Sequence, residues 1–262
     1  MNILDRIIEH KRTEVAAAKV TKSIAELKEM PLFAAPTLSL KKFLLDETKT
    51  GIIAEYKRQS PSKGVINSVS TVEEVTKAYA QNWASGISVL TDNHFFGGSL
   101  ADLEAATINQ VPLLRKDFMI DEYQLVEAKA YGASVILLIA ACLSPERVKE
   151  LTIAATDLGL EVLLEIHNED ELGHICDEVD LVGVNNRNLK DFEVNVEASA
   201  QLIKKIPTNK VAVAESGINN SDTIVFLRKA GFKGFLIGEH FMKQTHPTIA
   251  FADFVTELKT KS

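Results

Sequence analysis

The chain has 262 residues, of which 46% are hydrophobic and 25% are charged, a composition typical of a globular protein with a large core. Its formal charge is −7 and its lysines and arginines are scattered, which argues against a nucleic-acid partner because such partners favour a basic patch. No apolar run approaches the roughly 20 residues of a membrane-spanning helix, and four charged residues within the first eleven argue against a signal peptide or membrane anchor. Two distant cysteines without a CxxC spacing are typical of a reducing compartment, so we expect a cytoplasmic protein.

Residues 1–48 are predicted to form a helical extension and not an independent domain. Apolar residues recur at helical spacing from Ile3 to Val15, with charged residues between them. Ser23 is followed three residues later by Glu26, a capping box that predicts the start of a second short helix. The connector over 31–45 leads to another short helix. Since this segment is too small to fold alone, we expect it to pack on the rest of the chain.

The sequence from residue 49 onward alternates between strand-like and helix-like patterns without a break in composition. Strands are predicted at 52–57, 87–91, 112–116, 134–140, 161–166, 181–186, 210–215 and 234–238. Helices are predicted at 72–84, 100–109, 121–131, 144–158, 168–177, 195–205, 220–230 and 247–259. Strand sequences such as SVILLIA and VAVAE are nearly continuous apolar runs, which is typical of a parallel sheet covered on both faces.

Eight consecutive strand–helix units over 49–262 predict an α/β fold, a closed (β/α)8 TIM barrel with an N-terminal helical extension. We expect residues 1–262 to form a single domain. An open doubly wound sheet is the alternative. No GxGxxG sequence follows a predicted strand and no GxxxxGK[ST] loop occurs, so the usual dinucleotide and P-loop signatures are missing.

The stretch GIIAEYKRQSPSKG, residues 51–64, shows what the end of the first strand carries. Glu55 and Lys57 project from the same face as Ile53, because side chains alternate along a strand. A buried carboxylate and a buried ammonium are costly unless they are paired or used. A salt-bridged strand end followed by an ordinary polar turn is the alternative interpretation.

The C-terminal strand ends of such a barrel converge on one face, where the active site lies. Five further strand ends carry residues in register with the core, namely Lys116, Glu165, Asn185, Arg187, Glu215, Leu236 and Gly238. Phe118, His167 and Glu239 follow three of these ends. Charged side chains normally point outward, whereas these point to the same side of each strand as the core residues. This pattern indicates an active site, with a stabilising ion-pair layer as the alternative.

Glycines after the seventh and eighth strands point to phosphate binding. Ser216-Gly217 and Gly238-Glu239 lie where many barrels bind phosphate through backbone N–H groups. Glycine fits this role because a Cβ atom would block close approach of the backbone to the phosphate oxygens.

Two carboxylate–histidine pairs raise the question of a metal. Glu165 and His167 share one strand face, and Asp92 and His94 lie in the loop after the second strand. A metal site would need a third ligand of matching geometry, and the neighbouring lysines would repel a divalent cation. We therefore expect no metal.

Seven segments, in order along the chain, resemble the indole-3-glycerol-phosphate synthase family of tryptophan biosynthesis. They are IIAEYKRQSPSKG, VLTDNHFFGGSL, LLRKDFMID, LLEIHNEDEL, VGVNNRNL, AESGI and FLIGEHFM. The resemblance covers essentially the whole chain, including the helical extension that this family carries before its barrel. It implies conversion of 1-(2-carboxyphenylamino)-1-deoxyribulose 5-phosphate into indole-3-glycerol phosphate, with release of CO₂ and water and without a metal or an organic cofactor.

The resemblance also implies roles for individual residues. Lys116 corresponds to the general acid of ring closure and Glu165 to a catalytic carboxylate. Lys57 and Glu55 correspond to residues of substrate binding and of the later proton transfers; which lysine acts at which step stays open. The implied substrate-binding residues are Ser60, Phe118, Asn185, Arg187 and Glu215. The implied phosphate-binding residues are Ser216, Gly217, Leu236, Gly238 and Glu239.

Two rival functions remain for a chain of this kind. One is a related phosphate-binding barrel, either the isomerase that precedes this step or the lyase subunit that follows it, and the other is a non-catalytic barrel. The first explains neither the EYKRQSPSKG loop nor the helical extension, and the second conflicts with the presence of Lys116 and Glu165. We expect a monomer with a small phosphorylated substrate, and leave open a transient association with other enzymes of the tryptophan pathway. The extension is expected to reach the catalytic face, with a cap at the other end of the barrel as the alternative.

Overall fold

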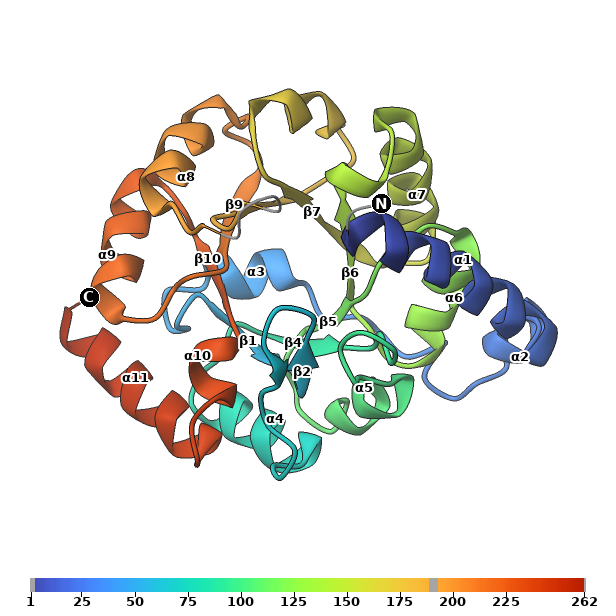
Figure 1. Ribbon diagram of the computed structural model, residues 1–262, viewed down its shortest axis with the longest axis horizontal. Coiled ribbons are helices and arrows are strands. Elements are labelled where there is room, and N and C mark those ends of the chain that lie inside the picture. The colour runs from blue at the N-terminus through green and yellow to red at the C-terminus, as the bar shows by residue number, and fades with distance from the viewer. Residues whose placement is uncertain (1–2, 189–192, 262) are drawn as a thin grey trace.

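The computed structural model describes residues 3–188 and 193–261. Its parallel strands form a closed barrel in the order β1-β10-β9-β8-β7-β6-β5-β4 (Figure 1). They are β1 (Ile52–Tyr56), β4 (Gly86–Leu90), β5 (Leu113–Lys116), β6 (Val135–Ile139), β7 (Glu161–Ile166), β8 (Leu181–Asn185), β9 (Val211–Glu215) and β10 (Gly234–Ile237). Each strand begins and ends within one residue of its predicted bounds. The closed order confirms the predicted barrel and excludes the open sheet.

Helices connect the strands and form the outer ring (Figure 1). They are α4 (Val72–Gln81), α5 (Leu100–Ala106), α6 (Glu122–Ala130), α7 (Pro145–Asp157), α8 (Val196–Leu202), α9 (Ser221–Ala230), α10 (Glu239–Met242) and α11 (Pro247–Lys261), with the 3₁₀ helices η1 (Ala140–Cys142), η2 (Glu169–His174) and η3 (Ile203–Lys205). The prediction of a helix over 168–177 was too long, because only the 3₁₀ helix η2 forms there. Gly173 lies inside it, and glycine is a poor residue for an α-helix interior.

Two apolar layers result from the alternation of strand side chains. Apolar residues of the barrel interior include Ile53, Leu114, Leu137, Leu163, Val213 and Leu236. The residues of opposite parity pack between the barrel and its helices. Glu55, Glu165 and Glu215 each lie two residues after an interior residue of the same strand, so their side chains also point into the barrel and not toward the helices.

The N-terminal extension contains α1 (Ile3–Thr21), α2 (Ile24–Lys28) and α3 (Leu40–Leu45), and its predicted capping box at Ser23 is present. Helix α3 closes the end of the barrel where the strands begin. Leu40 and Leu44 of α3 belong to the interior apolar cluster. The Lys41 Nζ atom lies 2.7 Å from Asp180, next to the start of β8. This part of the extension is therefore a cap at the bottom of the barrel.

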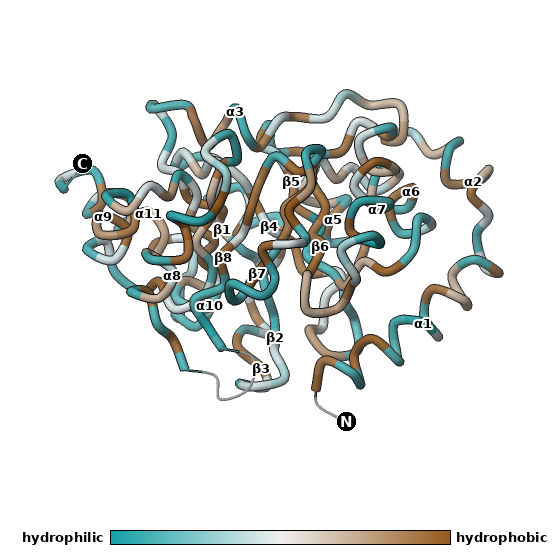
Figure 2. The backbone as a smooth tube through the Cα atoms, turned by 90° about the horizontal axis from the view of Figure 1, so that it is seen from above, coloured by the Kyte–Doolittle hydropathy of each residue, from teal (hydrophilic) through white to brown (hydrophobic). Residues whose placement is uncertain are grey.

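Helix α1 lies at the opposite end. Figure 2 places α3 on one side of the barrel, and α1 with the short hairpin of β2 (Gln59–Ser60) and β3 (Gly64–Val65) on the other. Lys11 of α1 contacts Asp92 and Asp117, which follow the C-terminal ends of β4 and β5. The two alternatives for the extension are thus both realised, by different helices. The hairpin was not predicted, because its strands are two residues long.

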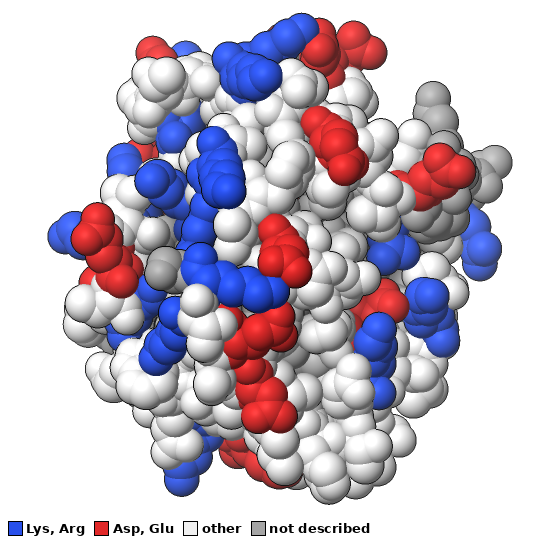
Figure 3. All heavy atoms as spheres, turned by 90° about the vertical axis from the view of Figure 1, so that its left-hand side faces the viewer, with Lys and Arg blue, Asp and Glu red and all other residues white. Residues whose placement is uncertain are grey.

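The surface shows no broad basic patch on the face drawn in Figure 3, where Lys and Arg side chains lie among Asp and Glu. No helix within 3–188 and 193–261 combines the length and the apolar character that crossing a membrane requires.

Candidate active site

An alternating set of ammonium and carboxylate groups lies at the C-terminal strand ends. The Nζ atom of Lys116 lies 3.4 Å from Oε2 of Glu165 and 3.9 Å from Oε2 of Glu215. The Nζ atom of Lys57 lies 2.9 Å from Oε1 of Glu55. The three carboxylates are almost completely buried, whereas the two lysine side chains are 16% and 18% exposed. The four predicted catalytic residues therefore come together, with the two lysines as the more exposed members of the set.

The protonation of Lys116 follows from its neighbours. Burial alone would lower the pKa of Lys116, but the charges of Glu165, Glu215 and Glu55 outweigh burial and raise the pKa. Lys116 is accordingly an ammonium ion at neutral pH. A protonated lysine can donate a proton to a substrate, and carboxylates beside it can accept a proton in a later step.

The two carboxylates near Lys116 have pKa values shifted in opposite directions. Burial favours the neutral form of Glu165, but Lys116, His167 and Asn185 lower its pKa, so it is ionised. Burial raises the pKa of Glu215 to about 8, and the charge of Glu165 adds to this shift. Glu215 is therefore protonated at neutral pH. Two carboxyl groups kept in different states can serve as base and hydrogen-bond donor in one site.

Asn185 and Arg187 extend this network along the end of β8. The Nδ2 atom of Asn185 donates a hydrogen bond of 3.0 Å to Glu165, and its Oδ1 atom accepts one from the backbone N–H of Arg187. The guanidinium of Arg187 lies 3.6 Å from the carboxylate of Glu239, beyond the end of β10. Arg187 thus links the end of β8 to the end of β10.

The expected phosphate end shows tight backbone geometry. Ser216 and Gly217 have φ angles of 67° and 71°, in the left-handed region that favours glycine. A Cβ atom on Gly217 would lie 2.2 Å from Val194, and one on Gly238 would lie 2.5 Å from Oε1 of Glu55. Gly238 is therefore required for the packing of Glu55.

The other predicted binding residues lie at different distances from the cluster. Phe118 packs against the interior cluster and its ring centroid lies 6.0 Å from that of Phe96. Leu236 is a buried residue of the interior. Ser60 is half-buried in β2, where it pairs with Gly64 of the hairpin and not with the catalytic residues.

Lys11 is a site-supporting residue that the sequence analysis did not single out. It is completely buried, with Nζ 2.9 Å from Asp92 and 2.8 Å from Asp117. Asp117 follows Lys116 directly, and its Oδ1 atom accepts the backbone N–H of Phe118. The available signal was spacing: Lys11 lies four residues after Ile7 and four before Val15, on the buried stripe of α1. Asp92, considered above as a metal ligand, is used in this ion pair.

His167 also takes a role that its sequence position did not reveal. Its two ring nitrogens lie 3.1 Å from Glu165 and 3.3 Å from Glu171. Burial would lower the pKa of His167, but these two carboxylates raise it to about 10, so the ring is charged.

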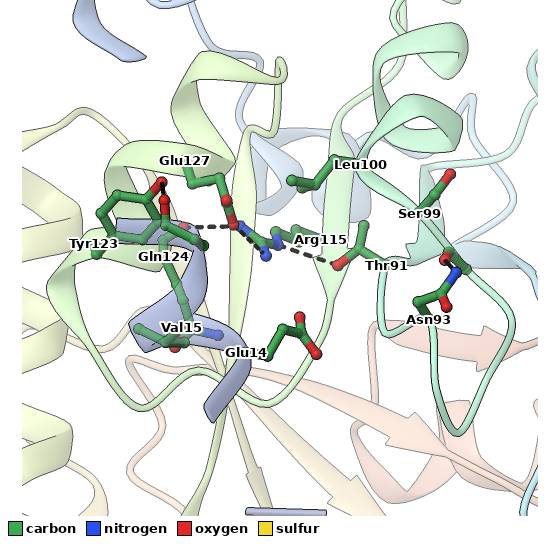
Figure 4. Close-up of a pocket in the computed structure, with 12 residues that line it drawn as sticks. Glu14, Val15, Thr91, Asn93, Ser99, Leu100, Arg115, Tyr123, Gln124 and Glu127 are labelled. Carbon is green, nitrogen blue, oxygen red and sulfur yellow. Dashed lines mark hydrogen bonds and ion pairs between the residues drawn. The ribbon is translucent and has the colours of Figure 1, made fainter. Parts of the chain in front are cut away.

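A hollow of about 270 Å³ lies beside the site, between α1 and the β5–α6 region (Figure 4). The buried guanidinium of Arg115 crosses it, 2.8 Å from Glu127 and 3.2 Å from Asp117. Glu14 and Val15 of α1 form the opposite wall. Arg115, which lines the hollow, pairs with Asp117, and Asp117 in turn pairs with Lys11. The hollow therefore belongs to the junction between the extension and the barrel and not to the cluster around Lys116.

Comparisons with known proteins identify the family of this chain. A family model described as "Indole-3-glycerol phosphate synthase" matches residues 4–254. A protein named indole-3-glycerol phosphate synthase from Bacteroides thetaiotaomicron is 46% identical over 259 residues, covering 98% of this chain and 99% of that protein. One of the same name from Salinibacter ruber is 44% identical over 263 residues, covering 99% and 97%. A mutant tryptophan synthase α-subunit from Pyrococcus furiosus matches with a TM-score of 0.63 at 19% identity, covering 81% of this chain and 99% of that one, which is a likeness of fold alone.

Proposed function

The chain belongs to the indole-3-glycerol phosphate synthase family, and from that premise we propose how its residues divide the steps of the reaction. It closes the ring of 1-(2-carboxyphenylamino)-1-deoxyribulose 5-phosphate and releases CO₂ and water to give indole-3-glycerol phosphate, a step of tryptophan biosynthesis. It is a decarboxylating carbon–carbon lyase. The rival barrel enzymes are set aside by the identity of 44–46% to relatives of this name.

Lys116 is the general acid of ring closure. As the aromatic carbon attacks the ketone carbon, the ketone oxygen gains negative charge and needs a proton. The observation that supports this role is the position of Lys116 3.4 Å from ionised Glu165, which keeps Lys116 protonated until the substrate oxygen takes the proton. CO₂ then leaves and its bonding electron pair restores the aromatic ring.

Dehydration uses the remaining acid and base groups. The departing hydroxyl needs a proton, and the ring carbon must lose one to a base. Ionised Glu165 and the Lys57–Glu55 pair supply these functions. Glu215, neutral at pH 7 because of its raised pKa, donates a hydrogen bond to a substrate oxygen. Which of Lys57 and Lys116 donates the proton in each step stays open.

Binding is divided between the two sides of the cluster. Phe118 contacts the aromatic ring of the substrate, and Asn185, Arg187 and Ser60 hold its polar groups. The phosphate lies at the ends of β9 and β10, held by backbone N–H groups around Ser216, Gly217, Leu236, Gly238 and Glu239. The carboxylate of Glu239 would repel a phosphate, and its ion pair with Arg187 offsets that repulsion.

The chain is a single domain, a monomer in the cytoplasm, whose encounters with other tryptophan-pathway enzymes are at most transient. The packing of α3 into the barrel interior and of Lys11 against two strand ends supports one folding unit. The reaction needs no metal or organic cofactor, since acid and base groups for every step are at hand.

The test of this function is the formation of indole fluorescence from the purified protein and the carboxyphenylamino substrate in the presence of a chelator. Turnover that survives the chelator supports a reaction carried by side chains alone. No product with this substrate, from protein shown to be folded by circular dichroism, would overturn the proposed function.

A further inference from the structure

The overall reaction consumes one proton in each turnover. The ketone oxygen takes one proton in ring closure and a second when it leaves as water, and the ring returns one to a base. CO₂ leaves from an ionised carboxylate, so its departure releases an electron pair to the ring but no proton. The balance is one proton taken from solvent, which must reach an acid that the bound substrate covers.

A line of three side chains leads from the catalytic cluster toward solvent. The Nε2 atom of His167 lies 3.1 Å from Oε1 of Glu165, and its Nδ1 atom lies 3.3 Å from Oε2 of Glu171. The exposed fraction of the side chain rises along this line, from 5% for Glu165 to 8% for His167 and 15% for Glu171. The other end of the line is Lys116, 3.4 Å from Glu165.

The loop after β7 holds this line in place. The backbone N–H of His167 donates a 2.6 Å hydrogen bond to Oε2 of Glu171, which fixes the carboxylate beside the ring. His174 contacts the backbone oxygen of Glu171 through Nδ1 and that of Leu143 through Nε2, and so anchors η2. The nearby thiol of Cys142 stays neutral, because burial and the charges of Glu165, Glu171 and Asp5 raise its pKa to about 12.

We propose that Glu171 and His167 form a relay that carries the proton consumed in each turnover to Glu165 and on to Lys116. The inference rests on the proposed function. Once Lys116 has given its proton to the substrate, ionised Glu165 takes the Nε2 proton of His167 on its Oε1 atom. The carboxyl group then turns about its Cγ–Cδ bond and donates this proton to the neutral amine of Lys116, which lies on the side of Oε2. The ring is left neutral, turns about its Cβ–Cγ bond, and regains a proton from solvent through Glu171.

The electrostatics favour this direction of transfer. The pKa of His167 is raised to about 10, so the ring is charged at rest, and the pKa of Lys116 is raised above its usual value of 10.5. A proton therefore moves downhill from the imidazolium to a deprotonated Lys116. The Nε2–H bond does not point straight at Glu165, so the transfer requires a small rotation of the ring.

The test compares His167→Gln and Glu171→Gln with His174→Gln, a matched control on the same 3₁₀ helix whose ring contacts only backbone oxygens. The kcat is measured at saturating substrate in a dilute, bulky buffer and again with added imidazole. We expect kcat of both relay variants to fall about 10-fold in the dilute buffer, less than the loss of a group that transfers a proton to the substrate itself, and to recover when imidazole is added. Added imidazole should not change kcat of the wild type or of His174→Gln.

A kcat that stays at the wild-type level, or that falls equally with and without imidazole, would overturn the relay. Thermal melting of each variant shows whether it is folded, and Glu171→Gln provides the test if His167→Gln is not. Failure of the proposed function is distinct, because it would appear as a wild-type protein that makes no product in any buffer.

Discussion

The Nζ atom of Lys116 on β5 lies 3.4 Å from Oε2 of Glu165 on β7, although β6 runs between these two strands. The curvature of the closed barrel brings inward-pointing residues of alternate strands together at the same level. In a flat sheet the two side chains would be separated by two strand spacings, roughly 10 Å. The ion pair between Lys116 and Glu165 is thus a product of barrel closure.

The buried Lys11 should prove essential to the junction between α1 and the barrel. Lys11→Met removes the cation that pairs with buried Asp92 and leaves Asp117 with Arg115 alone, and breaking a buried ion pair typically costs about 3–5 kcal/mol. We expect a lower free energy of unfolding in urea and a lower kcat, because Asp117 holds the backbone next to Lys116.

Lys19→Met is the matched control for this experiment. Lys19 lies on the same helix and pairs with Asp121 at 2.7 Å, but the pair is exposed, so its loss should change stability by less than about 1 kcal/mol. Equal effects of the two substitutions would show that burial of the Lys11 pair does not matter.

Helix α3 should matter for stability and not for chemistry. Leu44→Ala removes a buried side chain from the interior cluster, which typically costs about 2–5 kcal/mol. Since α3 lies at the end of the barrel opposite the catalytic cluster, kcat/KM below the melting temperature should stay near the wild-type value. Removal of residues 1–22, which takes α1 away and leaves α3, should instead impair turnover more than melting. Reversal of this pattern would contradict the division of the extension into a cap and a support.

The raised pKa of Glu215 predicts a specific pH dependence of stability. Its pKa is about 8 in the folded protein and near 4.5 when exposed, so the folded state binds more protons between these values and stability falls as pH rises through this window. Glu215→Gln removes the titration. Urea unfolding at about pH 5 and about pH 8 should show a smaller loss for the variant than for the wild type. An identical loss of stability in both proteins would show that a group other than Glu215 titrates in this window.

Gly238 is expected to serve both Glu55 and the phosphate. In Gly238→Val the new Cβ atom would lie 2.5 Å from Oε1 of Glu55, so the carboxylate must move. We expect a higher KM and weaker inhibition by inorganic phosphate, accompanied by a lower kcat. Gly173→Ala is a control, because a Cβ atom there meets nothing within 4 Å. An unchanged KM and phosphate inhibition in folded Gly238→Val would move the phosphate site away from β10.

The barrel and the convergence of charged side chains at its C-terminal end could be predicted because both depend on local patterns. Apolar runs mark the buried strands, and the parity of Glu55, Glu165 and Glu215 follows from strand alternation. A long helix after β7 was wrongly predicted, since capping signals at Asn168 start a helix but do not set its length.

The contacts of Lys11 and His167 could not be predicted in the same way. Lys11 meets Asp92 and Asp117 across about 80 and 105 residues of sequence, and only the fold defines such distances. His167 shares a strand parity with Glu165, which suggested metal ligation, and the position of Glu171 one turn later decides its actual partner.

The most direct measurement is the single-turnover rate of indole formation by Lys116→Ala at saturating substrate. The account predicts a loss of about 10²-fold or more, within the usual range for a general acid, with substrate still bound. Lys41→Ala is the matched control, because Lys41 pairs with Asp180 at the far end of the barrel and should leave the rate unchanged. A Lys116→Ala rate close to that of the wild type would contradict the assignment of Lys116 as the acid that closes the ring.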